Sequence, residues 1–390
     1  MAIEFEKRNM RNFELKQQKH RRNRKLIIIA GAIIAIGILT SSIYFMINKN
    51  YSGFEVVHSI ERSDSSSAKY LSYKTGVLRY SRDGAVAMDS EGNQLWNGTY
   101  QMKNPIVDIS GNFVAISDRG YKTVQIFDGE GGMKTVEVQY PIIMTKIANQ
   151  GVIAVLMEGN EVNYISLYDK AGKNLINSRT IAGEDGFPID MDLSENGRKL
   201  VTSYVSLTSG TVQSKVTFYN FGVGQNYIDR LVGGFDYGQT LIADVEFLDN
   251  DTVAAFGDNK YCLYQVKELP KLIQEEEISG EIKSILHNNK YLGFVVQNTE
   301  EPDLYKLQLF DLSGKNLLDK TLNYEYDTIY LSGDEIIMYT EQDLMIWRVN
   351  GREKVHSTFD NQVSYILPSK GSDHYILING AQMQEISLTD

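Results

Sequence analysis

The sequence is poor in the residues that cross-link or interrupt a fold. Its 390 residues include a single cysteine, Cys262, so no disulfide can form within the chain. A large domain outside the cytoplasm would therefore depend on its core alone. Cys262 stands in the apolar stretch YCLYQV, which is typical of a strand, and we interpret it as a small buried residue and not as a nucleophile. The six prolines are few for a disordered chain of this length.

Signatures of catalysis and of metal binding are also missing. The five histidines never occur at HxxxH or HxH spacing, and the sequence has neither a G-x-S-x-G elbow nor a P-loop. The acidic stretches DLSENG and DNDTVAAFGDN lack the ligand order of an EF-hand, and we interpret them as turns. We therefore predict no catalytic, cofactor-binding or metal-binding residue, and we expect no nucleic-acid partner.

Charge is distributed unevenly along the chain. Residues 1–25 contain nine lysines or arginines against three glutamates, a net charge of +6. Subtracting this from the total of −11 leaves −17 for the remainder. Such a split indicates that the two parts face different surroundings. The basic residues could also lie against anionic lipid, although a topology signal alone would explain them.

A long uncharged run follows the basic residues, over 22 positions from Leu26 to Ile47. A helix of this length reaches roughly 33 Å, enough to cross the hydrocarbon core of a membrane. A cleaved signal peptide is the alternative, but the run is too long for one and no A-x-A site follows it. The basic flank of a span stays in the cytoplasm. We therefore expect a basic cytoplasmic tail (1–25), a transmembrane helix (26–47), a linker (48–53) and an extracytoplasmic domain (54–390).

A repeated phrase predicts the architecture of that domain. LYDKAGKNLI begins at Leu167, and LFDLSGKNLL begins at Leu309. In each, an apolar strand leads into Asp, Gly follows three positions later, and apolar residues then resume. This is the pattern of a β-hairpin, in which Gly supplies a positive φ and Asp accepts backbone N–H groups. Related hairpins turn near Gly92, Gly131, Gly222, Lys267 and Gly351.

The spacing of the seven hairpins indicates a β-propeller. They recur about every 43 residues, and a period of 40–45 with four short strands per unit is typical of propeller blades. The 24 tyrosines also favour strands over helices. We predict an all-β fold of four-stranded antiparallel sheets.

The two ends of the domain together predict an eighth blade. The C-terminal stretch QVSYILPSKGSDHYILINGAQMQEISL offers three strands, and GFEVVHSIE near the N-terminus offers one. Their union would close the ring and leave no open edge. The N-terminal strand should pair with QEISL. Its alternation places Phe54, Val56, His58 and Ile60 on one side, and Glu55, Val57 and Ser59 on the other. Seven blades are the alternative, if this strand only leads into the first blade.

Several stretches resemble known propellers. PIDMDLSENGRKLVTSYV resembles the D-x-S-x-D/N-G-x-x-L motif of TolB-like and YVTN-like bacterial propellers. The domain as a whole resembles the eight-bladed PQQ-like (quinoprotein-like) and WD40-like propellers. The single-pass topology resembles a family of membrane-anchored propellers of unknown function from Gram-positive bacteria. Quinoprotein dehydrogenases carry a cofactor-stacking Trp and a vicinal disulfide. The two tryptophans, Trp96 and Trp347, stand in outer hairpins and the disulfide is impossible, so we expect no quinone cofactor.

Four predicted loops combine aromatic and acidic residues. In a propeller, loops that leave the outer strand share a face with loops between the second and third strands. The loops of the first kind contain GEDGFP, GGFDYG, LNYEYD and TFDN. Aromatic rings with flanking acceptors can bind sugars, cationic peptides or proteins. Alternatively, the rings pack between blades and the acids only solvate the rim. The candidate binding residues are Glu184, Asp185, Phe187, Phe235, Asp236, Tyr237, Tyr324, Glu325, Tyr326, Asp327, Phe359 and Asp360.

Three classes of function fit these observations. We expect a non-enzymatic interaction or scaffold module at the outer face of the cell membrane, with an envelope protein as partner, as the resemblance to scaffolding propeller lipoproteins implies. A binder or sensor of cell-wall glycan or cationic peptide is the second class, and should show a broad aromatic patch. A hydrolase at the central channel is the third, and should gather an acid–base set there.

Overall fold

A computed structural model describes residues 24, 29, 31–41, 48–64, 67–208, 210–223, 230–301 and 303–390. The chain forms two compact units, residues 1–51 and 52–390. In the first unit, residues 31–41 are helical. Among the described residues, no helix is both long and apolar enough to cross a membrane. The predicted span 26–47 lies partly outside the described residues, because 26–28, 30 and 42–47 are not among them.

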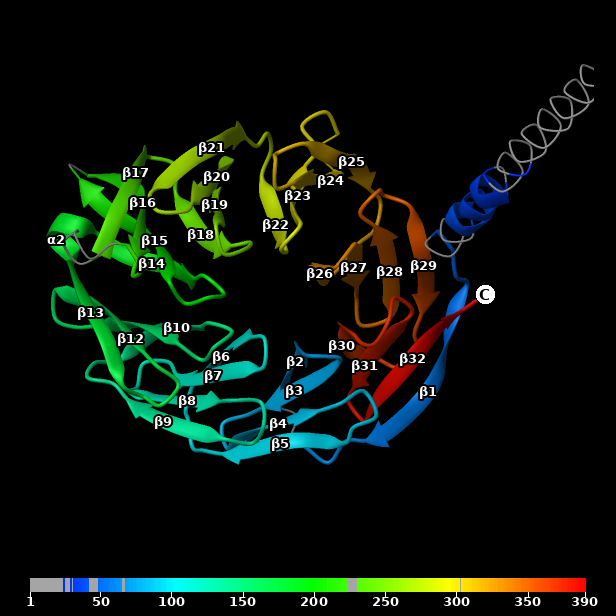
Figure 1. Cartoon of the computed structure of the whole chain (residues 1–390), viewed down its shortest axis with the longest axis horizontal. Helices are drawn as coiled ribbons and strands as arrows, with labels where there is room; N and C mark the ends of the chain where they lie inside the picture. Colours follow the sequence, from blue (N-terminus) through cyan, green and yellow to red (C-terminus); the bar gives the residue numbers. More distant parts are fainter. Residues whose placement is uncertain are drawn as a thin grey trace, which may run out of the picture. The chain divides into compact units, whose positions relative to one another are not determined.

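The second unit is an eight-bladed β-propeller. In the described part of the chain, eight four-stranded antiparallel sheets stand in a ring, with the first strand of each blade toward its centre (Figure 1). The predicted eight blades are thus confirmed, and the alternative of seven is wrong.

The elements have the following bounds, from the inner to the outer strand of each blade. Blades 1 to 4 are β2 (Lys69–Tyr73), β3 (Gly76–Tyr80), β4 (Gly84–Met88), β5 (Gln94–Thr99); β6 (Pro105–Ser110), β7 (Phe113–Asp118), β8 (Thr123–Phe127), β9 (Met133–Glu137); β10 (Ile142–Ile147), β11 (Ile153–Glu158), β12 (Val162–Tyr168), β13 (Asn174–Ile181); and β14 (Phe187–Leu193), β15 (Lys199–Thr208), β16 (Thr211–Asn220), β17 (Leu231–Gly238). Blades 5 to 8 are β18 (Ile242–Phe247), β19 (Thr252–Gly257), β20 (Lys260–Val266), β21 (Pro270–Glu277); β22 (Ile282–His287), β23 (Tyr291–Gln297), β24 (Tyr305–Asp311), β25 (Asn316–Leu322); β26 (Thr328–Ser332), β27 (Glu335–Tyr339), β28 (Asp343–Arg348), β29 (Glu353–Thr358); and β30 (Val363–Pro368), β31 (His374–Asn379), β32 (Gln382–Thr389), β1 (Gly53–Glu61). A short helix, α2 (Ala182–Asp185), precedes β14.

The repeated phrase is the hairpin between the third and fourth strands of a blade, as predicted. Gly172 and Gly314 have φ of 81° and 78°. Asp169 Oδ1 accepts the backbone N–H groups of Ala171 and Lys173, both at 2.9 Å, and Asp311 repeats the arrangement. The carboxylate therefore satisfies donors that the tight turn leaves without a backbone partner.

We predict that Gly172→Val and Gly314→Val each lower the free energy of unfolding by about 1–3 kcal/mol, because a β-branched residue is strained at positive φ. At Gly314 the new side chain would also overlap that of Gln274. Gly222→Val is the control, since Gly222 lies in the equivalent hairpin of blade 4 outside the left-handed region. Thermal unfolding of residues 51–390 measures the effect. Unchanged melting temperatures in both Gly172→Val and Gly314→Val would contradict this prediction.

The N-terminal strand closes the ring. β1 pairs antiparallel with β32 from Gly53 opposite Thr389 to Glu61 opposite Gln382, so the predicted pairing with QEISL is confirmed. The predicted alternation is wrong beyond Val56. The register shifts between Val56 and His58, so a β-bulge at Val57 inserts one unpaired residue. Cross-strand partners share a face of the sheet, which gives two sets: Phe54, Val56 and Ser59 on one side, and Glu55, His58 and Ile60 on the other.

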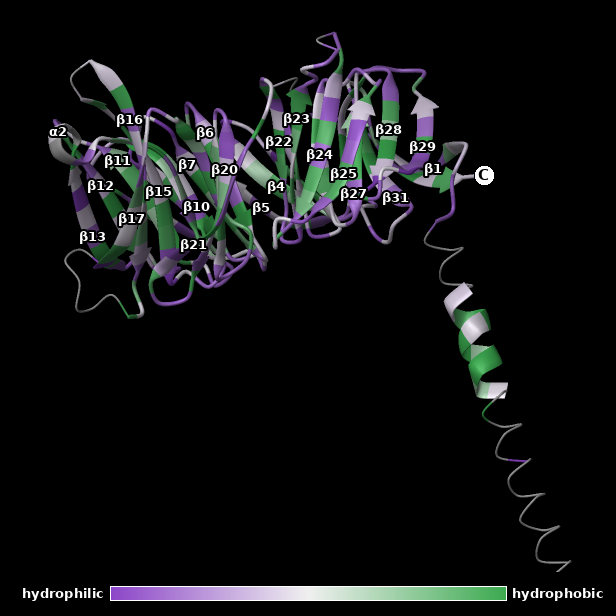
Figure 2. Cartoon of the chain, turned by 90° about the horizontal axis from the view of Figure 1, so that it is seen from above, coloured by the Kyte–Doolittle hydropathy of each residue, from purple (hydrophilic) through white to green (hydrophobic). Residues whose placement is uncertain are grey.

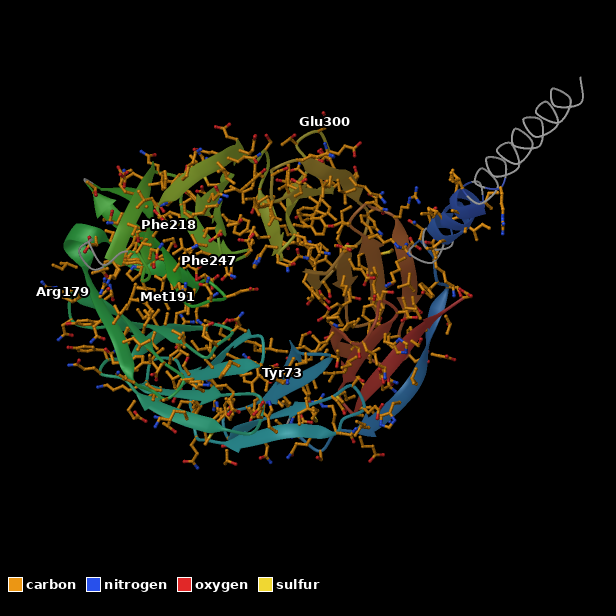
Figure 3. The ribbon with its side chains drawn as sticks, viewed as in Figure 1. Tyr73, Arg179, Met191, Phe218, Phe247 and Glu300 are labelled. Carbon is orange, nitrogen blue, oxygen red and sulfur yellow. The ribbon has the colours of Figure 1, made fainter. Side chains whose placement is uncertain are left out.

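The core lies between neighbouring blades. Hydrophobic residues concentrate in the strands, and the connecting loops are mostly hydrophilic (Figure 2). Between blades 4 and 5, buried Phe218 and Phe247 belong to one cluster (Figure 3). Cys262 belongs to the same cluster and is fully buried, and burial raises the pKa of its thiol. The interpretation of Cys262 as a small core residue is therefore confirmed.

Candidate functional site

The loops between blades share one face of the propeller with the loops between second and third strands. Phe359 N, after β29, donates to the carbonyl of Gln342 in the β27–β28 loop at 2.9 Å. Arg119 N, after β7, donates likewise to the carbonyl of Asn104 at 3.0 Å. We call this surface the loop face. All four predicted binding stretches lie on it or at the strand ends that meet it.

Two of the predicted stretches meet on blade 4. Glu184 and Asp185 lie in α2, and Phe187 is the first residue of β14. Asp185 Oδ1 lies 3.7 Å from Lys215 Nζ. Asp236 is the cross-strand partner of Lys215, so both stretches converge on this one lysine.

Phe235, Asp236 and Tyr237 were predicted in a loop, but they lie within the outer strand β17. The ring of Phe235 packs 5.0 Å from that of Tyr264, and the hydroxyl of Tyr237 hydrogen-bonds the hydroxyl of Tyr264. Strand pairing with β16 extends through Gly238, because bulges in β17 let it follow its long neighbour. These two rings therefore serve the core of blades 4 and 5, and Asp236 alone of the three is exposed.

The other two stretches flank blade 7, one before its first strand and one after its last. Tyr324 donates to Asp343 Oδ1 at 3.3 Å, and the same oxygen lies 3.0 Å from His356 Nε2. Tyr326 shares a hydrogen bond with Ser284 at 2.9 Å. Phe359 packs its ring 5.7 Å from that of Phe54 in the closing strand.

Rings and carboxylates alternate in exposure along these stretches. Tyr324, Tyr326 and Phe359 are partly buried, whereas Glu325, Asp327 and Asp360 are exposed. The rings therefore fix the backbone against the blades, as the packing alternative expected, and the carboxylates face solvent. Phe187 departs from this pattern, because its side chain is 58% exposed. The twelve candidate residues thus form three groups, one on blade 4, one between blades 6 and 7, and one between blades 7 and 8.

A groove of about 600 Å³ opens beside the second group. We call it the acidic groove. Its described lining includes Lys283 and Tyr305 together with the Tyr324–Asp327 stretch and Asp303. Lys283 Nζ lies 4.5 Å from the ring centroids of both Tyr305 and Tyr326, a cation–π arrangement. Among the described lining residues, three carboxylates oppose this one lysine, so the groove keeps a negative balance.

The inner strands carry a charged cluster that was not predicted from the sequence. Lys146 Nζ of β10 lies 3.2 Å from Asp192 Oδ1 of β14 and 3.3 Å from Glu246 Oε1 of β18. These two contacts therefore tie blades 3, 4 and 5 together. Burial lowers the pKa of Lys146, but the carboxylates of Asp192 and Glu246 outweigh it and raise that pKa well above its usual value.

Carboxylates of the inner strands also accept N–H groups from the next blade. Asp108 Oδ2 accepts Ile147 N at 2.6 Å, Asp190 Oδ2 accepts Val245 N at 2.8 Å, and Asp192 Oδ2 accepts Phe247 N at 2.7 Å. An innermost strand has one unpaired edge, and each bond satisfies an N–H group there. Burial raises the pKa of Asp108 to about 6 and that of Asp190 to about 7.

A signal for this cluster was present in the sequence. PIVDIS forms β6, PIDMDL lies in β14 and IADVEF forms β18, and each carries acids at alternate or central positions of an apolar strand. Beside Asp108 lies a cavity of about 770 Å³, lined by inner strands of blades 1, 2, 7 and 8 and including Tyr70, Tyr330 and Tyr365. Among the described residues, no group of three or more His, Cys, Asp or Glu has a geometry that could hold a metal ion.

Comparison with known proteins identifies the family. The model of a family of unknown function, DUF5711, matches residues 47–388. The chain belongs to this family. No curated protein matches this DUF5711 member.

Solved structures agree on the fold. BamB from Moraxella catarrhalis is similar with a TM-score of 0.52 and 11% identity, over 86% of this chain and 100% of that one. A eukaryotic initiation factor is similar with a TM-score of 0.53 and 13% identity, over 86% of this chain and 87% of that one. At such identities the likeness shows the fold alone, and it places this DUF5711 member among the β-propellers.

Proposed function

We propose that this protein is a membrane-anchored, non-enzymatic interaction module, with its propeller outside the cytoplasm, that holds a cationic segment of an envelope protein in the acidic groove. The anchoring rests on the sequence, in which nine basic residues precede 22 uncharged ones. The topology resembles that of membrane-anchored propellers of unknown function from Gram-positive bacteria.

One observation carries the choice of partner. Lys283 belongs to the wall of the acidic groove, and its ammonium lies 4.5 Å from the centroids of two tyrosine rings. The groove therefore already holds one cationic group against aromatic rings. Asp303, Glu325 and Asp327 line the same groove and are exposed, so a second cation would find both carboxylates and aromatic surface. A lysine- or arginine-rich segment has the complementary chemistry.

The inner-strand cluster supports a structural role over catalysis. Asp108, Asp190 and Asp192 accept main-chain N–H groups, and Asp192 and Glu246 pair with Lys146. These partners belong to the propeller itself and tie its blades together. A sugar ligand for the aromatic loops is the second candidate, favoured by the exposed ring of Phe187 on blade 4.

Photo-crosslinking in intact membranes tests the proposed binding. The full chain would carry a photoreactive residue at Asn323, which is exposed and lines the acidic groove. We expect a discrete adduct whose cross-linked peptide is rich in lysine or arginine. Glu325→Gln with Asp327→Asn should reduce its yield about tenfold, because two charge-assisted contacts are lost.

The matched control is Glu91→Gln with Glu130→Gln, which neutralises two exposed carboxylates in hairpins away from the groove. Its adduct should keep the yield of the unmodified chain. Equal yields from the groove variant and the unmodified chain, or an adduct peptide without basic residues, would reject a cationic partner in the acidic groove.

A further inference from the structure

The loop face is divided by charge. The loops between strands of blades 1 and 2, at residues 81–83, 100–104 and 119–122, contain four lysines or arginines and one aspartate. The corresponding loops from residue 159 to residue 381 contain twelve acidic residues and no lysine or arginine. Over residues 52–390 as a whole, 29 basic residues stand against 47 acidic ones. The basic sector therefore reverses the sign of the rest of the face.

A hollow of about 820 Å³ lies in this sector. Its described lining includes Lys69 at the start of β2, Arg82 after β3, Lys103 before β6 and Arg119 after β7, and contains no Asp or Glu. We call it the basic hollow. All four side chains are exposed, and within the described part of the chain none of them forms an ion pair.

Hydrogen bonds from a buried side chain fix the backbone that carries these cationic side chains. Asp118 is buried and accepts Lys103 N at 3.0 Å and Asn104 N at 2.7 Å. Asn104 accepts Arg119 N in turn at 3.0 Å. The buried carboxylate of Asp118 is therefore engaged by main-chain donors. Lys103 Nζ lies 4.9 Å from the ring centroid of Tyr121, which holds the ammonium at the rim.

Four unneutralised cations around one concavity repel one another, and an anion in their midst relieves that repulsion. A phosphate group offers three or four oxygens and up to two charges, so it can take donors from two arginines and a lysine together. A carboxylate offers two oxygens and one charge. Arginine forks match phosphate geometry, and Ser81 and Asn104 add polar groups to the lining.

We propose that the basic hollow binds a phosphate-bearing polyanion. The hollow is larger than a single phosphate group, which favours a ligand with several linked phosphates. The phosphates could belong to a soluble chain or to lipid headgroups, and the two sources share this chemistry. The site lies on blades 1 and 2, away from the acidic groove between blades 6 and 7. This proposal therefore does not depend on the proposed function.

Calorimetric titration of the full chain in neutral detergent at low salt tests the site. The probes are tripolyphosphate in solution and, separately, micelles of the same detergent that contain phosphatidylglycerol against micelles that contain phosphatidylcholine. Arg82→Gln with Arg119→Gln should weaken binding about tenfold or more, because each arginine contributes charge-assisted hydrogen bonds. Lys170→Gln with Lys173→Gln removes the same charge from the exposed β12–β13 hairpin and should change the affinity less than twofold.

Binding of tripolyphosphate that depends on the two arginines supports a soluble source, and arginine-dependent binding of the phosphatidylglycerol micelles alone supports a lipid source. Three results would overturn the proposal: no binding of either probe, equal loss in both double variants, or equally tight binding of polyglutamate. Thermal unfolding of each variant separates a lost site from a lost fold, since exposed side chains should leave the melting curve unchanged.

Discussion

A chain that begins at Ala68 should be less stable than one that begins at Tyr51 by several kcal/mol, and less soluble. The shorter chain lacks β1, which forms eight cross-strand residue pairs with β32. Each cross-strand pair contributes roughly 0.2–1 kcal/mol. Ile386 and Leu388 of β32, now 0% and 5% exposed, would lose their cover. The bare edge of β32 would also invite pairing between molecules.

Thermal unfolding and size-exclusion chromatography of the two chains measure this effect. The shorter chain also loses Arg62, which pairs with Asp64 at 2.8 Å and donates to the carbonyl of Asn379. Arg62→Ala in the chain that begins at Tyr51 separates that contribution, and should cost less than the whole strand. Two monomeric chains with equal melting curves would show that β1 does not close the ring.

Replacement of Lys146 by Met should lower the free energy of unfolding by about 3–5 kcal/mol, because it leaves the buried carboxylate of Asp192 and the partly buried carboxylate of Glu246 without their counter-ion. Lys146 Nζ contacts Asp192 at 3.2 Å and Glu246 at 3.3 Å, from three different blades. Glu246→Gln added to Lys146→Met should restore part of the lost free energy of unfolding, since one of the two carboxylates without a counter-ion is then neutralised. Urea unfolding of residues 51–390 measures both.

The matched control for this pair is Lys290→Met. Lys290 contacts Asp334 at 3.0 Å, but both side chains are more than half exposed. Water screens such a pair, so its loss should cost no more than about 1 kcal/mol. If Lys146→Met proves as mild as Lys290→Met, the inner-strand cluster does not hold the blades together.

Local turn chemistry made most of the fold predictable. The spacing of Asp169 and Gly172 is a property of four consecutive residues, and the same Asp-x-x-Gly spacing recurs at Asp89, Asp128 and Asp311. The closing strand was predictable because three C-terminal strands lacked a fourth. The bulge at Val57 was not, since an alternating pattern assumes an unbroken register and nothing in FEVVHSI marks the extra residue.

The charged sites were harder to predict because they join distant positions. Lys146, Asp192 and Glu246 are each about one blade apart in sequence, and they meet only when the inner strands form a ring. The same holds for Arg82 and Arg119 in the basic hollow. The aromatic-acidic loops were found from composition, but composition could not say which rings would be buried. The rings of Phe235 and Tyr237 pack in the core, whereas Phe187 is exposed.

Protease treatment of intact protoplasts tests the central proposal, an anchored propeller displayed outside the cytoplasm, most directly. The sequence carries +6 over residues 1–25 and −17 beyond them, so the basic end should stay inside. Protease added outside should degrade the propeller that follows residue 50 and leave a tag at the N-terminus protected and bound to the membrane. A propeller that resists the protease until the protoplasts are lysed would contradict the proposal, as would a shortened soluble propeller in the medium, the product of a cleaved signal.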